Sequence, residues 1–185
     1  MLLNIIKDFY IFRVGFFIVL MMSSLSNVYA TTTSHPSPTL HNQFSKWSVY
    51  QYPDLDKTVC FALSIPNVSE PESVKHGINF FIVSAKNKTS DSYLPELVMD
   101  YPLDEETMVS VEVSGKYSSG QIFKMKPHNN RAVFEKRFYD DMLIKEMRSG
   151  KELIVSARSK RGTNTRYVYS LTGLSNAIAD VLKCK

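Results

Sequence analysis

Short apolar runs that alternate with polar residues are the feature that most constrains the fold of this chain. Across 108–113, Val109, Val111 and Val113 share one face, while Ser110 and Glu112 share the other. A period of two is typical of strands in an antiparallel sheet that buries one face. Comparable runs, most of them bounded by Pro, Gly, Asn, Asp or Ser, lie at 47–52, 58–65, 78–85, 97–101, 122–125, 131–134, 152–158 and 166–171.

Two segments have the pattern of short helices. Over 140–149, Asp140 and Asp141 would supply the N-cap and the first-turn charge, and Gly150 would supply a left-handed C-terminal cap. Over 176–183, which Ser175 would cap, four residues form one apolar stripe: Ala177, Ile178, Val181 and Leu182. Strands and helices do not alternate regularly, which disfavours a doubly wound fold. The sequence predicts an all-β fold, an antiparallel sandwich or barrel-like sheet with two short helices.

Residues 1–30 have the parts of a secretory signal peptide. Lys7 and Arg13 precede an apolar run at 14–22, and Val28 and Ala30 occupy the −3 and −1 positions of a cleavage site. We expect cleavage after Ala30. The alternative is an uncleaved N-terminal anchor, because the 17 uncharged residues of 14–30 are at the lower limit for spanning a bilayer. No comparable stretch follows, so no membrane span is expected after cleavage.

The rest of the chain is expected to form one domain. Residues 31–46 begin with a stretch rich in Thr, Ser, Pro and His, and we expect them to be a flexible lead-in to a domain at 47–185. A hydrophobic content of 44% excludes a disordered or collagen-like chain. The net charge of +4 falls to +3 without the leader, an excess too small to indicate specific nucleic-acid binding.

Both cysteines of the chain, Cys60 and Cys184, follow the leader. An even number of cysteines in an exported protein favours one disulfide, because the compartment beyond the inner membrane is oxidising. The bridge would join an early strand to the end of the C-terminal helix. The alternative is a pair of buried free thiols.

The sequence contains no familiar catalytic or metal-binding arrangement. Its four histidines lack the spacing of a metal site, and four surface or loop histidines are the better interpretation. Ser175 lies in a near match to a nucleophile elbow, but no histidine follows it, so a helix cap is favoured. The adjacent carboxylates at 104–106 and 140–141 are poorly placed to face one substrate. We expect no enzyme activity, no metal and no cofactor.

Four cations surround a turn that contains Gly162: Arg158, Lys160, Arg161 and Arg166. One interpretation is an anion-binding hairpin tip for phosphate, polysaccharide or a nucleic-acid backbone, to which Thr163 and Thr165 add hydroxyl donors. The other is a hairpin whose charges keep its edges soluble.

Several segments together carry a family resemblance. They are 147–155 (MRSGKELIV), 159–165 (SKRGTNT), 169–177 (YSLTGLSNA) and the closing Cys184, preceded by Trp47 and 59–66 (VCFALSIP). In this order they resemble the invasion-associated locus B family. The match extends over roughly 47–184 and is loose in the central part, 86–107.

This resemblance implies a small exported bacterial protein, periplasmic or secreted, that contributes to host-cell interaction or invasion. It implies no catalytic residues and no cofactor. Some family members have extra cysteines, whereas this chain has two. We expect a binding protein whose partner is an anionic component of the host surface or the bacterial envelope. The alternatives are a structural periplasmic protein without a host partner, and an enzyme whose site is assembled from residues distant in sequence.

Overall fold

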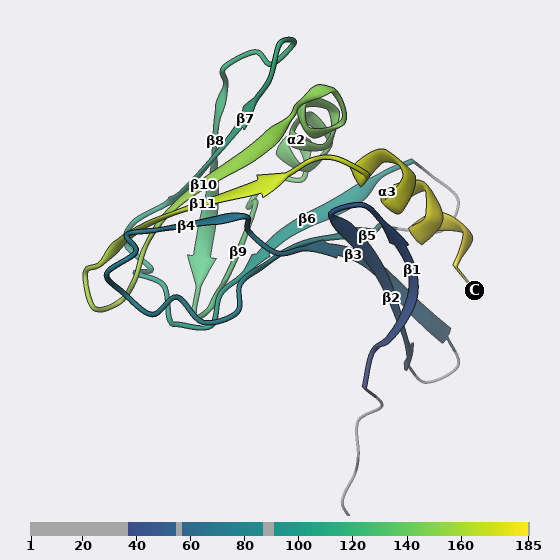
Figure 1. The fold of residues 1–185 in the computed structure, drawn as a ribbon, viewed down its shortest axis with the longest axis horizontal. Helices are drawn as coiled ribbons and strands as arrows, with labels where there is room; N and C mark the ends of the chain where they lie inside the picture. Colours follow the sequence, from purple (N-terminus) through teal and green to yellow (C-terminus); the bar gives the residue numbers. More distant parts are fainter. Residues whose placement is uncertain (1–36, 55–56, 87–90, 185) are drawn as a thin grey trace, which may run out of the picture. The chain divides into compact units, whose positions relative to one another are not determined.

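The computed structural model describes residues 37–54, 57–86 and 91–184 (Figure 1). The expected signal peptide at 1–30, with its cleavage site after Ala30, lies outside the described residues. Within them the chain forms an antiparallel β-sheet and two short helices, α2 (Phe138–Ser149) and α3 (Leu174–Lys183). The predicted all-β class is therefore confirmed. The sheet is sandwich-like and does not close, which decides between the two expected arrangements.

The described residues contribute eleven strands to this sheet. In chain order they are β1 (Thr39–Phe44), β2 (Trp47–Asp54), β3 (Lys57–Ser64), β4 (Val68–Glu70), β5 (Phe80–Ala85), β6 (Tyr93–Val98), β7 (Val109–Ser114), β8 (Ile122–His128), β9 (Arg131–Val133), β10 (Glu152–Arg158) and β11 (Asn164–Ser170). Their spatial order is β1-β2-β3-β5-β6-β9-β8-β7-β10-β11-β4, so β1 and β4 are the edges.

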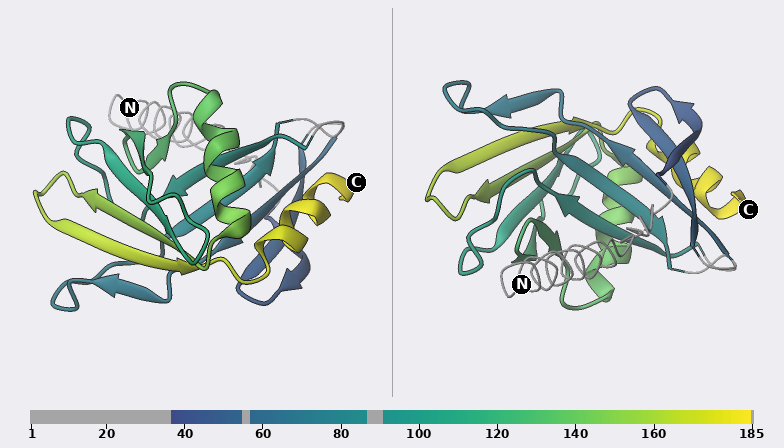
Figure 2. Two further views of the ribbon diagram at one scale, coloured as in Figure 1. Left: turned by 90° about the horizontal axis from the view of Figure 1, so that it is seen from above. Right: turned by 90° about the horizontal axis from the view of Figure 1, so that it is seen from below.

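One strand, β8, connects two halves of the sheet. Its first four residues pair with β7, and its last three pair with β9. We call β1, β2, β3, β5, β6 and β9 the first half-sheet, and β4, β7, β10 and β11 the second half-sheet. The helix α2 packs against β6, and α3 packs against β1, β2, β3 and β5 (Figure 2).

The core lies between the helices and the inner faces of the two half-sheets. Val109, Val111 and Val113 are all buried, as their alternation with polar residues predicts. The apolar stripe of α3 is also confirmed, with Ala177, Ile178 and Val181 buried and Leu182 packed beside them. Other large core side chains are Trp47, Phe81, Tyr93, Leu97, Phe123, Leu143, Met147, Tyr167 and Tyr169.

Two strands were not expected. The prediction that 31–46 is a flexible lead-in is wrong over β1, which pairs with β2 from Thr39↔Gln51 to Phe44↔Trp47. Nearly every residue of β1 is exposed, so the strand has no apolar period and forms through hydrogen bonds to its neighbour. The other unexpected strand is β4, whose three residues pair with β11. The expected strand at 97–101 is displaced, because β6 begins at Tyr93 and ends at Val98.

The ends of α2 differ from the prediction. Helix α2 begins at Phe138, so Asp140 and Asp141 lie in its first turn and neither is the N-cap. Gly150 follows the helix with φ of −82°, which is extended and not left-handed. A side chain at Gly150 would overlap with Val113, so close packing requires the glycine.

The start of α3 also differs. Ser175 is exposed in the first turn of α3 and does not cap it; the N-cap is Gly173, with φ of +96°. A side chain at Gly173 would overlap with the carbonyl oxygen of Phe44 in β1. This position therefore needs glycine both for its left-handed backbone and for the close approach of the two segments.

Candidate functional site

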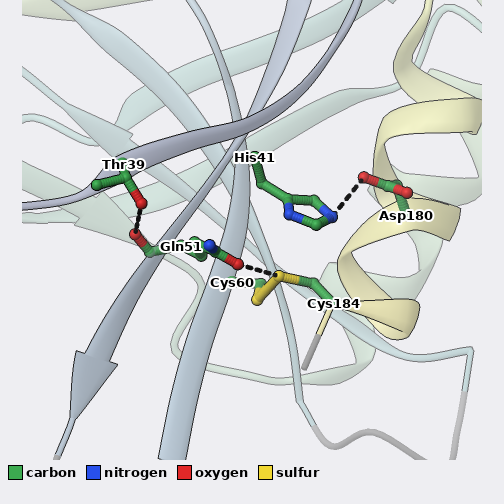
Figure 3. Close-up of a disulfide and its surroundings, with 6 residues drawn as sticks. All are labelled: Thr39, His41, Gln51, Cys60, Asp180 and Cys184. Atoms are coloured by element: carbon green, nitrogen blue, oxygen red, sulfur yellow. Dashed lines mark hydrogen bonds and ion pairs between the residues drawn. A yellow bond between two sulfur atoms is a disulfide. The ribbon is translucent and has the colours of Figure 1, made fainter.

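A disulfide joins Cys60 of β3 to Cys184, directly after α3 (Figure 3). The predicted bridge is thus confirmed, with the two Cα atoms 6.2 Å apart. The side chain of Gln51 on β2 lies against it, with Oε1 3.5 Å from the Cys184 sulfur. On the neighbouring strand, His41 Nε2 lies 3.6 Å from the Asp180 carboxylate of α3. The end of the chain is therefore held beside three strands of the first half-sheet.

The four predicted cations lie on the hairpin between β10 and β11. Arg158 ends β10, and Arg166 lies on β11 opposite Ser156. Their neighbours Ala157 and Thr165 are buried, so both arginines project from the outer face of the sheet. The turn is closed by backbone bonds from Ser159 N–H to the Thr163 carbonyl (2.9 Å) and from Gly162 N–H to the Ser159 carbonyl (2.8 Å).

The hairpin separates these cations into two classes. Arg158 Nε lies 3.3 Å from the Asp104 carboxylate, and Arg166 lies 3.1 Å from the Glu70 carboxylate. Lys160 and Arg161 are exposed at the tip and form no ion pair with any described residue. The uncompensated positive charge is therefore at the tip, which we call the Lys160–Arg161 tip.

The two threonines of this segment also differ. Thr165 is buried, and its hydroxyl donates to the Ala157 carbonyl at 3.2 Å. The expectation that Thr165 offers its hydroxyl to a bound anion is therefore wrong. Thr163 is half-buried beside the tip.

A shallow depression of about 490 Å³ adjoins the arginine pair. Its lining includes Met108, Ser110, Arg158, Arg166 and Glu70. An anionic group in this depression would meet the Glu70 carboxylate as well as the two arginines. The depression is therefore a weaker anion site than the exposed tip, whose Lys160 and Arg161 form no ion pair with any described residue.

A half-buried chain of hydrogen bonds, which joins three hydroxyl groups and His76, lies beneath the same hairpin and has no simple sequence signal. His76 Nε2 lies 2.9 Å from the Pro71 carbonyl oxygen, which can only accept a hydrogen bond. The proton is therefore on Nε2, and Nδ1 accepts from the Tyr167 hydroxyl at 2.9 Å. The Tyr101 hydroxyl continues the chain, 3.1 Å from Tyr167 and 2.8 Å from Thr165.

Burial raises the pKa of Tyr101 and of the neighbouring Tyr169 above the ordinary value of 10.0. Both phenols are therefore protonated at neutral pH. In this arrangement the chain of hydroxyls connects the β4–β5 loop to β11 and to the segment after β6.

An apolar groove of about 750 Å³ lies on the outer face of the first half-sheet. Its floor includes Tyr50, Phe61, Leu63, Ile82 and Val98, and the Tyr50 and Phe61 rings are stacked with centroids 6.0 Å apart. The outer face of an antiparallel sheet is ordinarily polar. The uninterrupted apolar runs at 59–63 and 80–83 are a sequence signal for strands that are apolar on both faces.

The groove has few ionisable groups. The charged side chains in its lining are Lys46 and Arg131, and Arg131 is paired with Glu96 at 2.7 Å. Among the described residues, no three or more His, Cys, Asp or Glu side chains are grouped so that they could hold a metal ion. Neither helix of the described part is long and apolar enough to cross a membrane.

One of three comparisons with known proteins, the one with solved structures, agrees with the resemblance noted from the sequence. No family model matches the chain, and no curated protein matches it. Among solved structures, the chain is similar to the crystal structure of invasion associated protein B from Bartonella henselae, with a TM-score of 0.53 and 17% sequence identity. The match covers 78% of this chain and 96% of that chain. The resemblance to the invasion-associated locus B family is thus confirmed at the level of the fold, which this chain shares with invasion associated protein B.

Proposed function

We propose that the protein is an exported member of the invasion-associated locus B family that acts by binding and not by catalysis. The observation that carries the proposal is the buried Cys60–Cys184 bridge, because disulfides form and persist in oxidising compartments. The fold shared with invasion associated protein B supports the same conclusion. The protein is then periplasmic or secreted.

The partner in this proposal is an anionic component of the host surface or the bacterial envelope. Support comes from the Lys160–Arg161 tip, which carries two exposed cations on a closed turn without a described counter-ion. A contribution to host-cell invasion is an analogy with the similar protein, whose name states that association.

Export is tested on the protein in its own cells. Cell fractionation, N-terminal sequencing and alkylation of the unreduced protein should give an extracytoplasmic chain that begins at Thr31 and has no reactive thiol. A cytoplasmic enzyme serves as the fractionation control. A protein that stays in the cytoplasm, keeps Met1 and has both thiols free to alkylation would refute export.

Partner binding is tested with Lys160→Ala/Arg161→Ala. The matched control is Lys145→Ala/Lys151→Ala, which removes the same charge from two exposed lysines elsewhere. Binding to a sulfated glycan and to host cells should weaken in the tip variant only, and the difference should be larger at low salt than at physiological salt. If the two variants bind equally at both salt concentrations, the hairpin charges serve solubility and the proposed partner site is wrong.

The same measurements separate the alternatives. A structural periplasmic protein would pass the export test, yet the wild type would bind neither glycan nor cells. An enzyme with a dispersed site would show turnover that survives the tip variant.

A further inference from the structure

A second surface, distant in sequence from the Lys160–Arg161 tip, exposes large apolar side chains beside cations. Phe138 is 70% exposed, Ile122 is 56% exposed and Tyr139 is 39% exposed. Scattered apolar residues are normal on a protein surface, but a contiguous group marks an interaction site. We call the following residues the aromatic–basic patch: Ile122, Lys124, Lys136, Arg137, Phe138 and Tyr139.

The residues of this patch are contiguous in space. A hollow of about 330 Å³ has a lining that includes Ile122, Lys124, Glu135, Lys136 and Tyr139, and so connects the start of β8 to the start of α2. The rings of Phe138 and Tyr139 are in edge contact, with centroids 5.8 Å apart. Phe138 therefore extends the surface that the hollow begins.

The exposed rings are anchored to the core. Tyr139 lies 5.9 Å from Phe134, and Phe134 lies 6.2 Å from Phe123, measured between ring centroids. Phe123 and Phe134 are buried on the inner side of the sheet. This series of rings leads from the core to solvent. Phe138 packs on its last member, Tyr139, and remains exposed.

The patch carries a positive excess. Lys124 Nζ donates to the Ser110 hydroxyl, and Lys136 forms no ion pair with a described residue. Arg137 lies 3.5 Å from the buried Asp140 carboxylate, which Lys86 also approaches at 3.6 Å. Glu135 also lines the hollow, but it is paired with Lys126 at 2.7 Å, and this pair is neutral as a unit.

We propose that the aromatic–basic patch docks the protein on an anionic lipid surface, with Phe138 entering the headgroup region. Aromatic and aliphatic side chains flanked by Lys and Arg are typical of interfacial anchors, because the apolar groups enter the boundary while the cations contact lipid phosphates. The long stems of Lys124 and Lys136 can also lie along the apolar layer. A fluid surface needs no fixed shape complement, which suits a small patch with a shallow hollow. This inference does not depend on the Lys160–Arg161 tip.

A fluorescent reporter tests the insertion directly. Trp47 is the only tryptophan and is fully buried, so its emission is a constant background. In Phe138→Trp, vesicles that contain phosphatidylglycerol should shift the new emission to the blue, whereas pure phosphatidylcholine vesicles should shift it little. Tyr117→Trp is the matched control, because Tyr117 is 73% exposed on the β7–β8 hairpin outside the patch; its emission should not shift.

Co-sedimentation with the same vesicles measures the affinity. Phe138→Asp should weaken binding by about tenfold or more, since the aromatic side chain that leaves water when the protein docks is lost. Lys124→Ala/Lys136→Ala should weaken binding by about fivefold for each cation. The full chain is used throughout, so residues 1–30 are the same in every variant.

Three results would overturn the proposal. The first is an unchanged emission of Phe138→Trp with anionic vesicles. The second is wild-type vesicle binding by both Phe138→Asp and Lys124→Ala/Lys136→Ala. The third is a blue shift that grows with protein concentration without lipid, which would assign the patch to a second copy of the chain. Because these side chains are exposed, the variants should fold, and unchanged Trp47 emission checks this.

Discussion

Removal of the Cys60–Cys184 bridge should destabilise the protein by several kcal/mol. The bond spans 124 positions, so it restricts most of the described chain in the unfolded state. The chain-entropy relation gives about 5 kcal/mol for a loop of this length, and measured losses for native bridges are about 2–5 kcal/mol. Since domains of this size are stable by only about 5–15 kcal/mol in total, the loss should be large against the whole.

Three forms of the protein separate the sources of this loss. Equilibrium urea unfolding is measured for the oxidised wild type, the reduced wild type and Cys60→Ala/Cys184→Ala. The reduced protein keeps both sulfur atoms, so its difference from the oxidised form reports the cross-link. The double variant adds the effect of removing the sulfur atoms of two buried residues, Cys60 (8% exposed) and Cys184 (1% exposed), and should be less stable again by about 1–2 kcal/mol.

The slope of the unfolding transition provides a second readout. Without the bridge the unfolded chain is more expanded, so the dependence of the free energy on urea should steepen. If reduction changes the free energy of unfolding by less than about 1 kcal/mol and leaves the slope unchanged, the entropic reasoning is refuted for this protein.

Two further predictions concern single positions. Gly173→Ala should lower the free energy of unfolding by at least about 2 kcal/mol, because this position combines φ of +96° with an overlap against Phe44. Gly120→Ala, at φ of +70° with open space around it, should lower it by about 1 kcal/mol. Equal losses in thermal unfolding would contradict the packing argument. Burial raises the pKa of Asp140 above 3.8 despite the opposing charges of Lys86 and Arg137. The folded state therefore binds this proton more tightly than the unfolded chain, and the free energy of unfolding falls as pH rises from 3.8 through the raised pKa. The stability of Asp140→Asn relative to the wild type should therefore increase as pH rises above 3.8, and a difference that does not change with pH would show that burial does not penalise the charged form.

Much of the sheet could be predicted because its strands bury one face. β7 and β10 follow the alternation of apolar and polar residues, and their bounds lie within one residue of the expected runs. The edge strands β1 and β4 could not be found in this way, since their residues are largely exposed and they form through backbone pairing with distant partners. The same limit applies to Gly150, whose need for a small residue depends on Val113, 37 positions away.

The candidate binding residues show the same division. The cluster of cations at 158–166 is visible in the sequence, but which of them are free to bind depends on acidic residues far along the chain. Arg166 is paired because β4 adds to the edge of β11 and places Glu70 directly opposite it. The aromatic–basic patch arises from the approach of β8 to the start of α2, two segments that are each unremarkable as sequence.

The position of the disulfide follows from how the C-terminal segment connects the two half-sheets. β11 belongs to the second half-sheet, whereas α3 covers the first, and the connection between them is held by Trp47 Nε1 donating to the Ser170 carbonyl at 2.9 Å. Chain ends fray most readily, and fraying of α3 would uncover the inner face of β3. A bond from Cys184 to Cys60 secures the helix at its free end. When the bridge is reduced, hydrogen exchange should therefore accelerate more in α3 than in the central strands. Equal acceleration in both would mean that the bridge acts only by restricting the unfolded chain and does not hold α3 on the sheet.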